Sequence, residues 1–107
     1  MITQFVKAAS VDEVPEGTML GVEVDGEEIC LAQLGGRFYA INNICSHMYT
    51  WLDSGDLFPE SLEVQCPLHD SRFSFETGMP TKPPAETPVK TYAVRVEGDD
   101  ILIGPAP

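Results

Sequence analysis

The sequence predicts an all-β protein in which short strands are joined by frequent turns. Its 107 residues include nine glycines and nine prolines, a large share of the residue types that end helices and mark turns. Several stretches alternate apolar and polar residues, which is the pattern of a strand with one buried face. The chain length fits one domain with one modest core.

The first part of the chain alternates through four expected strands. Residues 3–8 form the first, and Ser10 precedes Glu13 with the spacing of a capping box, so a helical turn should follow. An Asp-Gly dipeptide at 25–26 is a strong hairpin signal, and Gly-Gly at 35–36 marks the next turn. The strands expected around these two turns span residues 19–24, 28–34 and 37–42.

The middle of the chain, residues 43–88, lacks sustained alternation and is rich in Cys, His, Trp, Gly and Pro. Short strand-like pieces remain at 62–65 and 72–75. Alternation returns at 89–96, and a last strand follows a turn at 101–103. Loop-rich segments on a β scaffold are where functional groups usually lie.

This pattern predicts how the chain is organised. We expect a single domain over residues 1–107, with a β base formed by about residues 1–42 and 89–107. A loop-rich insert at about 43–88 should carry the functional groups.

The 17 acidic and 6 basic residues give a formal net charge of −11. Nucleic acid is excluded as a partner, because its phosphates need a basic face. The acidity favours a protein partner with a basic docking patch, although acidity that only keeps the protein in solution explains the same composition. We expect no membrane segment, because no apolar run approaches spanning length, and no signal peptide. Three cysteines are too few for a disulfide scaffold, so a cytoplasmic protein with reduced thiols is expected.

Two short segments supply metal-ligand chemistry, Cys45-Ser46-His47 and Cys66-Pro67-Leu68-His69. Each offers one thiolate and one imidazole, so two turn-like loops could converge on one inorganic centre. A two-iron cluster suits this supply, with both thiolates on one iron and both imidazoles on the other. A structural zinc ion also accepts two cysteines and two histidines, but zinc sites usually group like ligands with like.

The pattern Cys-x-His followed by Cys-x-x-His resembles the signature of Rieske [2Fe–2S] proteins. The resemblance covers nearly the whole chain and implies an antiparallel β-sandwich with a loop-rich cluster-binding subdomain inserted in a β base. Length, acidity and Cys-Pro-Leu-His are most similar to the ferredoxins of bacterial aromatic-ring dioxygenase systems. The further dipeptides that carry the resemblance are Ser54-Gly55, Arg72-Phe73, Thr77-Gly78 and Pro83-Pro84, the last resembling the proline loop that covers the cluster.

The resemblance implies one Rieske-type [2Fe–2S] cluster as cofactor. Cys45 and Cys66 would bind the inner iron, and His47 and His69 would bind the outer iron near the surface. Neutral imidazoles lower the negative charge of the cluster, which raises its reduction potential above that of all-cysteine clusters.

The loops also predict where that potential lies within the Rieske range. High-potential relatives carry an extra cysteine in each loop, joined as a disulfide, where this chain has Thr50 and Leu68. Their serine near the cluster sulfurs corresponds to Ser71, which could instead cap a turn, and their tyrosine corresponds to Phe73. Fewer hydrogen bonds to sulfur stabilise the reduced state less, so we expect a potential of about −150 mV.

The resemblance implies an electron carrier between a flavin-dependent NAD(P)H ferredoxin reductase and a terminal Rieske oxygenase, itself not an enzyme and expected to be a monomer. The chain lacks a nucleotide-binding glycine fingerprint. Its only two histidines are the expected cluster ligands, so a 2-His-1-carboxylate iron site is excluded. Three alternatives stay open: a small Rieske subunit of another oxidoreductase such as a nitrite reductase, a zinc-stabilised interaction module, and a redox sensor.

Four apolar side chains complete these expectations. Cys30 lies in an alternating strand and is expected in the core. Trp51 is expected to pack beneath the first loop. Met48 and Leu68 are expected to be partly exposed, because docking surfaces favour adaptable apolar contacts.

Overall fold

The computed structural model describes residues 2–47, 49–68 and 70–106. Within these residues each strand pairs antiparallel with its neighbours, and the helical turns are short 3₁₀ segments, so the all-β prediction is confirmed. The elements in chain order are β1 (Val6–Ser10), η1 (Val11–Glu13), β2 (Thr18–Val24), β3 (Glu27–Leu34), β4 (Arg37–Asn42), η2 (Leu52–Ser54), β5 (Asp56–Phe58), β6 (Glu63–Gln65), β7 (Arg72–Ser74), β8 (Pro80–Lys82), β9 (Thr91–Glu97) and β10 (Asp100–Gly104). No helix of this part of the chain is long and apolar enough to cross a membrane.

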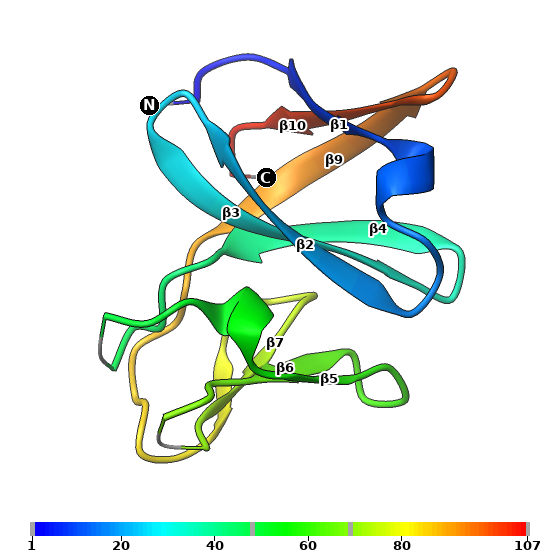
Figure 1. Ribbon diagram of the computed structural model, residues 1–107. Helices are drawn as coiled ribbons and strands as arrows, with labels where there is room; N and C mark the ends of the chain where they lie inside the picture. Colours follow the sequence, from blue (N-terminus) through cyan, green and yellow to red (C-terminus); the bar gives the residue numbers. More distant parts are fainter. Residues whose placement is uncertain (1, 48, 69, 107) are drawn as a thin grey trace.

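Six strands form the larger sheet, in the order β1-β10-β9-β4-β3-β2. The first and last strands are neighbours in it, which places both chain ends at the upper part of Figure 1. The two predicted hairpins are present, and their turn residues have positive φ: 51° and 81° at Asp25 and Gly26, 62° and 79° at Gly35 and Gly36. Two consecutive positive φ angles match the twist of the flanking strands, which is why Asp-Gly and Gly-Gly occupy these turns.

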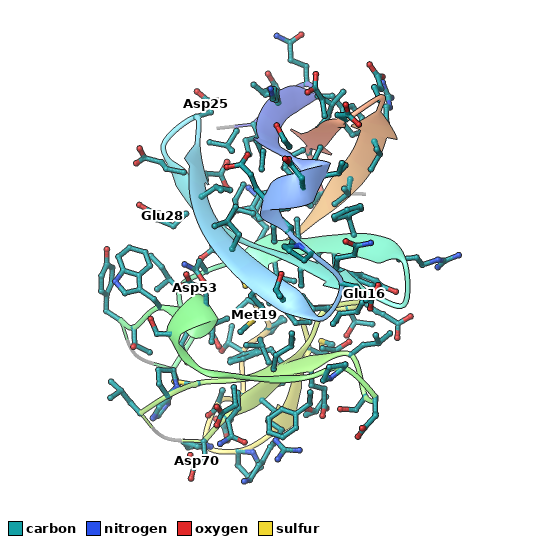
Figure 2. The ribbon with its side chains drawn as sticks, turned by 45° about the vertical axis from the view of Figure 1, so that its right-hand side comes forward. Glu16, Met19, Asp25, Glu28, Asp53 and Asp70 are labelled. Carbon is teal, nitrogen blue, oxygen red and sulfur yellow. The ribbon has the colours of Figure 1, made fainter. Side chains whose placement is uncertain are left out.

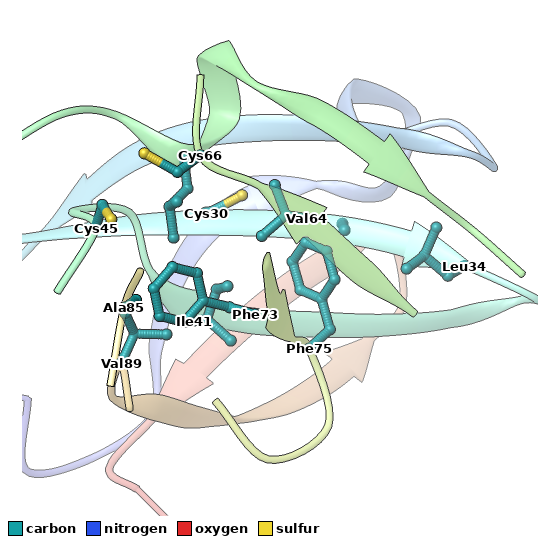
Figure 3. Packing of buried hydrophobic residues seen from close by; sticks show 12 residues of the cluster. Cys30, Leu34, Ile41, Cys45, Val64, Cys66, Phe73, Phe75, Ala85 and Val89 are labelled. Carbon is teal, nitrogen blue, oxygen red and sulfur yellow. The ribbon is translucent and has the colours of Figure 1, made fainter. Parts of the chain in front are cut away.

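The smaller sheet has the order β5-β6-β7-β8 and lies below the larger sheet in Figure 1. A shared core joins the two sheets. The larger sheet contributes Cys30 and Ile41, and the smaller sheet contributes Val64 and Phe73, all with no exposed surface (Figure 3). The second core, which includes Ile29, contains residues of the larger sheet and of the chain beside it, and none of the buried residues that form it belongs to the smaller sheet. Burying this apolar surface is the main force that holds the smaller sheet on the base.

Several boundaries differ from the prediction. β1 begins at Val6 and runs to Ser10, because Ser10 both pairs with Asp100 of β10 and precedes η1. The Ser10 amide donates to Glu13 Oε1 at 2.8 Å, so that half of the predicted capping box is present. Three short elements were not predicted: η2, β5 and β8. β8 starts with a proline, which a sheet accepts at an edge strand such as this one.

Candidate metal centre

The two cysteine segments form equivalent loops. In the first, the Cys45 amide donates to the Thr50 carbonyl at 3.0 Å. In the second, the Cys66 amide donates to the Ser71 carbonyl at 2.7 Å. One strand pair continues beyond each closing bond, Ile44 with Trp51 and β6 with β7. Each loop is therefore a six-residue hairpin tip whose first residue is a cysteine, and we call them the first loop (residues 45–50) and the second loop (residues 66–71).

The loops divide their side chains between interior and surface. Cys45 and Cys66 are 3% and 0% exposed, and both lie at the same end of the shared core (Figure 3). His47 is exposed, and so is Leu68, as predicted. His69 lies outside the described residues. Buried thiols with an imidazole at the surface are the arrangement expected for ligands of an inner and an outer iron.

A single metal ion is the alternative to a cluster for this donor set. Among the described residues, no three of His, Cys, Asp and Glu lie close enough together to hold one ion. A zinc site would need Cys45, His47 and Cys66 around one point. A two-iron cluster instead takes thiolates at one iron and imidazoles at the other. The donor types that the two segments offer, thiols and imidazoles, therefore suit a binuclear centre.

Residues 83–88, which we call the strap, connect the two loops. The Ala85 amide donates to Ser71 Oγ at 3.0 Å, inside the core. The Ser46 hydroxyl donates to the Thr87 carbonyl. Because Ser46 belongs to the first loop and Ser71 to the second, the strap fixes the position of the two loops relative to each other. The Ser71 oxygen therefore accepts a hydrogen bond from the strap, and its hydroxyl can still donate a hydrogen bond to another group.

Two of the glycines that carry the family resemblance lie where the chain passes itself closely. A Cβ at Gly55 would lie 1.7 Å from the Gln65 carbonyl oxygen. A Cβ at Gly78 would lie 2.1 Å from the Val89 carbonyl oxygen, and Gly78 also has a φ of 75°. Both contacts lie beside the loops or the strap, so these glycines let the cluster-binding segment pack tightly.

The first loop is anchored to the base through Asn43 and Asp53. Asn43 Nδ2 donates to Asp53 Oδ1 at 2.8 Å, and the Asp53 amide donates to Asn43 Oδ1 at 2.9 Å. The Leu52 amide donates to the Asn43 carbonyl, and the Asn43 amide donates to the Glu28 carbonyl in β3. Sequence reasoning missed this pair, because an isolated Asn and Asp ten residues apart have no recognisable signature.

The structure also tests the remaining apolar side chains. Cys30 has no exposed surface, and burial raises the pKa of its thiol well above the ordinary value, so its predicted core role is confirmed. The prediction that Trp51 packs beneath the loop is wrong, because 38% of its surface is exposed. Its ring instead meets Tyr49, which is 77% exposed, edge to face at 5.9 Å. The prediction for Met48 falls outside the described residues.

Comparison with known proteins decides the family, since residues 4–93 match the Rieske [2Fe–2S] domain. This chain belongs to the Rieske [2Fe–2S] domain family. The Rieske chain is 38% identical over 103 residues to the ferredoxin component of a naphthalene 1,2-dioxygenase system from Pseudomonas aeruginosa, which covers 96% of this chain and 97% of that protein.

Solved structures agree with this assignment. The ferredoxin of carbazole 1,9a-dioxygenase from Nocardioides aromaticivorans IC177 superposes with a TM-score of 0.91 at 42% identity, over 96% of this chain and 99% of that one. A chain from a complex of reduced oxygenase and oxidized ferredoxin in carbazole 1,9a-dioxygenase superposes with a TM-score of 0.89 at 25% identity, over 98% and 97%.

Family membership confirms the predicted cofactor, a Rieske-type [2Fe–2S] cluster, and rules out the zinc-stabilised module. It also confirms that the Rieske chain is an electron-carrying component rather than an enzyme, because its relatives are ferredoxin components of multicomponent dioxygenase systems. When bound, such a cluster accepts and releases one electron.

Proposed function

We propose that this Rieske protein carries single electrons from a flavin-dependent NAD(P)H ferredoxin reductase to a terminal ring-hydroxylating oxygenase. The observation that carries the proposal is the pair of equivalent loops, with buried thiols and an exposed His47, in a chain whose relatives are dioxygenase ferredoxin components. A relative of 25% identity occurs in a complex with its oxygenase, which supports an oxygenase as one partner.

We further propose that Cys45, His47, Cys66 and His69 hold the cluster. The thiols of Cys45 and Cys66 lie at one end of the shared core, where water is excluded. His47 lies at the surface, so an electron leaves through a short path on that side. The strap and the Asn43–Asp53 pair anchor the two loops, which keeps their rearrangement small when the cluster gains or loses an electron.

We therefore propose that the protein transfers electrons and itself makes or breaks no bond of a substrate. We propose a monomer in the cytoplasm, where the nicotinamide cofactor of the reductase is available. A negative net charge of −11 supports partners with basic docking surfaces, which electrostatic attraction would bring together quickly.

Reconstitution tests this proposal. The holoprotein is combined with NADH, a flavin reductase of a dioxygenase system and the terminal oxygenase of a naphthalene 1,2-dioxygenase system, and product formation is followed. We expect product only when the Rieske protein is present, and none with the Cys66→Ser variant. A cluster-loaded protein that is reduced by dithionite but never reduces the oxygenase would contradict the proposal.

A further inference from the structure

A hollow of about 370 Å³ opens beside the first loop, where the loop meets the base. Strand β2 contributes Gly21 and strand β3 contributes Glu28, while Trp51 comes from the end of the first hairpin. We call it the Trp51 hollow, and its lining residues are Gly21, Glu28, Asn43, Trp51, Asp53 and Ser54. Figure 2 shows the labelled side chains of Glu28 and Asp53 on the same side of the molecule.

The Trp51 hollow is lined by two acidic residues, and its lining among the described residues contains no basic one. Asp53 uses Oδ1 to accept from Asn43, while Oδ2 lies over Gly21, where an added Cβ would be only 2.6 Å away. In the described part of the chain, neither Oδ2 of Asp53 nor the carboxylate of Glu28 receives a hydrogen bond or ion pair. The ion pairs found among the described residues lie outside the hollow, and they are Lys7–Asp100, Arg72–Glu63, Lys90–Glu27 and Arg95–Glu97.

Trp51 adds an aromatic face to the same hollow. It is the single tryptophan of the chain, it is 38% exposed, and Tyr49 supports it edge to face. Leaving Tyr49 largely exposed and Trp51 partly exposed forgoes burial energy, and exposed aromatic groups of this kind mark interaction sites. Sequence reasoning expected Trp51 in the interior, and such a local disagreement is expected where function competes with packing.

Carboxylates beside an indole face match one side chain best. A guanidinium group is planar, is always charged, stacks on aromatic faces and pairs with carboxylates, whereas an ammonium is a compact and strongly hydrated point charge. Arginine is also enriched at the centres of protein interfaces. The chemistry of the Trp51 hollow therefore favours an arginine presented by a partner over a lysine.

We propose that the Trp51 hollow receives an arginine side chain of the terminal oxygenase. This inference rests on the proposed function and specifies how the partner is recognised. Trp51 lies four residues after the exposed His47 in the same hairpin. An arginine bound in the hollow therefore places the oxygenase next to His47, where the electron is proposed to leave.

The test measures the dissociation constant of the cluster-loaded protein for the terminal oxygenase of a naphthalene 1,2-dioxygenase system. Trp51→Ala should weaken binding about tenfold, as expected for an aromatic interface anchor. Glu28→Gln should weaken it about threefold to tenfold and reduce its salt dependence. Trp51→Phe keeps an aromatic face and should recover most of the loss.

Controls separate recognition from folding and from charge. Asp12→Asn removes the same charge as Glu28→Gln but lies in η1, outside the hollow, and should change binding less than about twofold. Each variant should retain its visible spectrum and its reduction potential. Blocking the oxygenase arginines with phenylglyoxal should remove the difference between wild type and Trp51→Ala, while acetylating its lysines should not.

The outcomes are distinguishable. Unchanged binding in Trp51→Ala and Glu28→Gln, with a wild type that still reduces the oxygenase, overturns the docking proposal and leaves the proposed function intact. Weaker binding to the reductase alone also overturns it, because the partner would be wrong. A wild type that neither binds nor reduces the oxygenase overturns both proposals together.

Discussion

Ser71 is a buried residue that contacts the strap through its hydroxyl and closes the second loop through its backbone carbonyl. It has no exposed surface, its oxygen accepts from the Ala85 amide, and its carbonyl closes the second loop. Ser71→Ala would leave the buried Ala85 amide without its acceptor, which costs about 1–3 kcal/mol of unfolding free energy. We also propose that the Ser71 hydroxyl donates to a cluster sulfur, as the resemblance to Rieske proteins implies, so its loss should lower the reduction potential by on the order of tens of millivolts.

Voltammetry and thermal unfolding of the holoprotein check this prediction for Ser71. Ser61→Ala is the matched control, because Ser61 donates to Glu63 at the surface. A Ser71→Ala protein with the stability and potential of wild type would contradict the role given to the strap.

Glu27 is the residue that most clearly links stability to pH. Its carboxylate accepts from Lys90 at 2.9 Å, from Tyr92 at 2.7 Å and from the Ile2 amide at 3.0 Å. The hydrogen bond from Lys90, followed by that from Tyr92, lowers the pKa of Glu27 to about 2. A carboxyl whose folded pKa is depressed stabilises the protein above its unfolded value near 4.5, and this stability is lost as pH falls toward 2.

Glu27→Gln should therefore lower the unfolding free energy at pH 7 by about 2 kcal/mol, a figure reduced for the partial exposure of Lys90. Urea unfolding of wild type and variant at several pH values measures this. The difference between the two should shrink below pH 4.5. A difference that stays constant down to pH 3 would show that packing, not charge, causes the loss.

At the scale of elements, the return of the chain from the small sheet to the base depends on Gly78. The Gly78 amide donates to the Ser74 carbonyl, and the Val89 amide donates to the Gly78 carbonyl. Gly78→Ala would place a Cβ 2.1 Å from the Val89 oxygen at a φ of 75°. We expect a loss of more than about 2 kcal/mol, because strain and steric overlap act together.

Gly98→Ala is the control for the backbone strain alone. Gly98 has a φ of 62°, and nothing lies within 4 Å of an added Cβ there. Its loss should be about 1 kcal/mol. Equal losses for the two variants, measured by thermal unfolding, would show that the close approach at Gly78 is unimportant.

The strands differ in how well their own residues predict them. β4 matches its predicted span, and β2 and β3 match within one residue at the start, because alternation and two-residue turns determine long hairpins locally. β5 and β8 were missed, because strands of three residues depend on the strands beside them rather than on their own pattern. Trp51 was misplaced for a related reason: hydrophobicity predicts burial, but the end of a hairpin left it beside an open hollow.

At the scale of the whole molecule, the topology divides the strands between two sheets. We propose that residues 43–88 form a cluster-binding insert on a base made by about 1–42 and 89–107. The six-stranded sheet, which contains the paired first and last strands, supplies most of the regular structure. The Cys and His residues predicted the family because each loop supplies both of its ligand types within a few residues of sequence. The strap and the Asn43–Asp53 anchor depend on contacts between segments separated in the sequence, so no local sequence pattern predicts them.

The net charge of −11 predicts how the protein meets its partners. The second-order rate of electron transfer to the oxygenase should fall about tenfold between 20 mM and 500 mM NaCl, because salt screens long-range attraction. The rate within the formed complex should change little. Stopped-flow measurement at several salt concentrations checks both. A rate that rises with salt would mean that the partner surface is acidic or that charge does not guide the encounter.

A Rieske cluster held by Cys45, His47, Cys66 and His69 is the central proposal, and EPR of the anaerobically purified protein tests it most directly. Spectra before and after dithionite are combined with iron, sulfide and zinc analysis of the same sample. We predict two irons per chain, no signal when oxidised, and a rhombic reduced signal whose average g lies below that of all-cysteine clusters. His47→Ala should abolish that signal, while Cys30→Ala should retain it. An EPR-silent protein with one zinc per chain, or a normal signal in His47→Ala, would contradict the account.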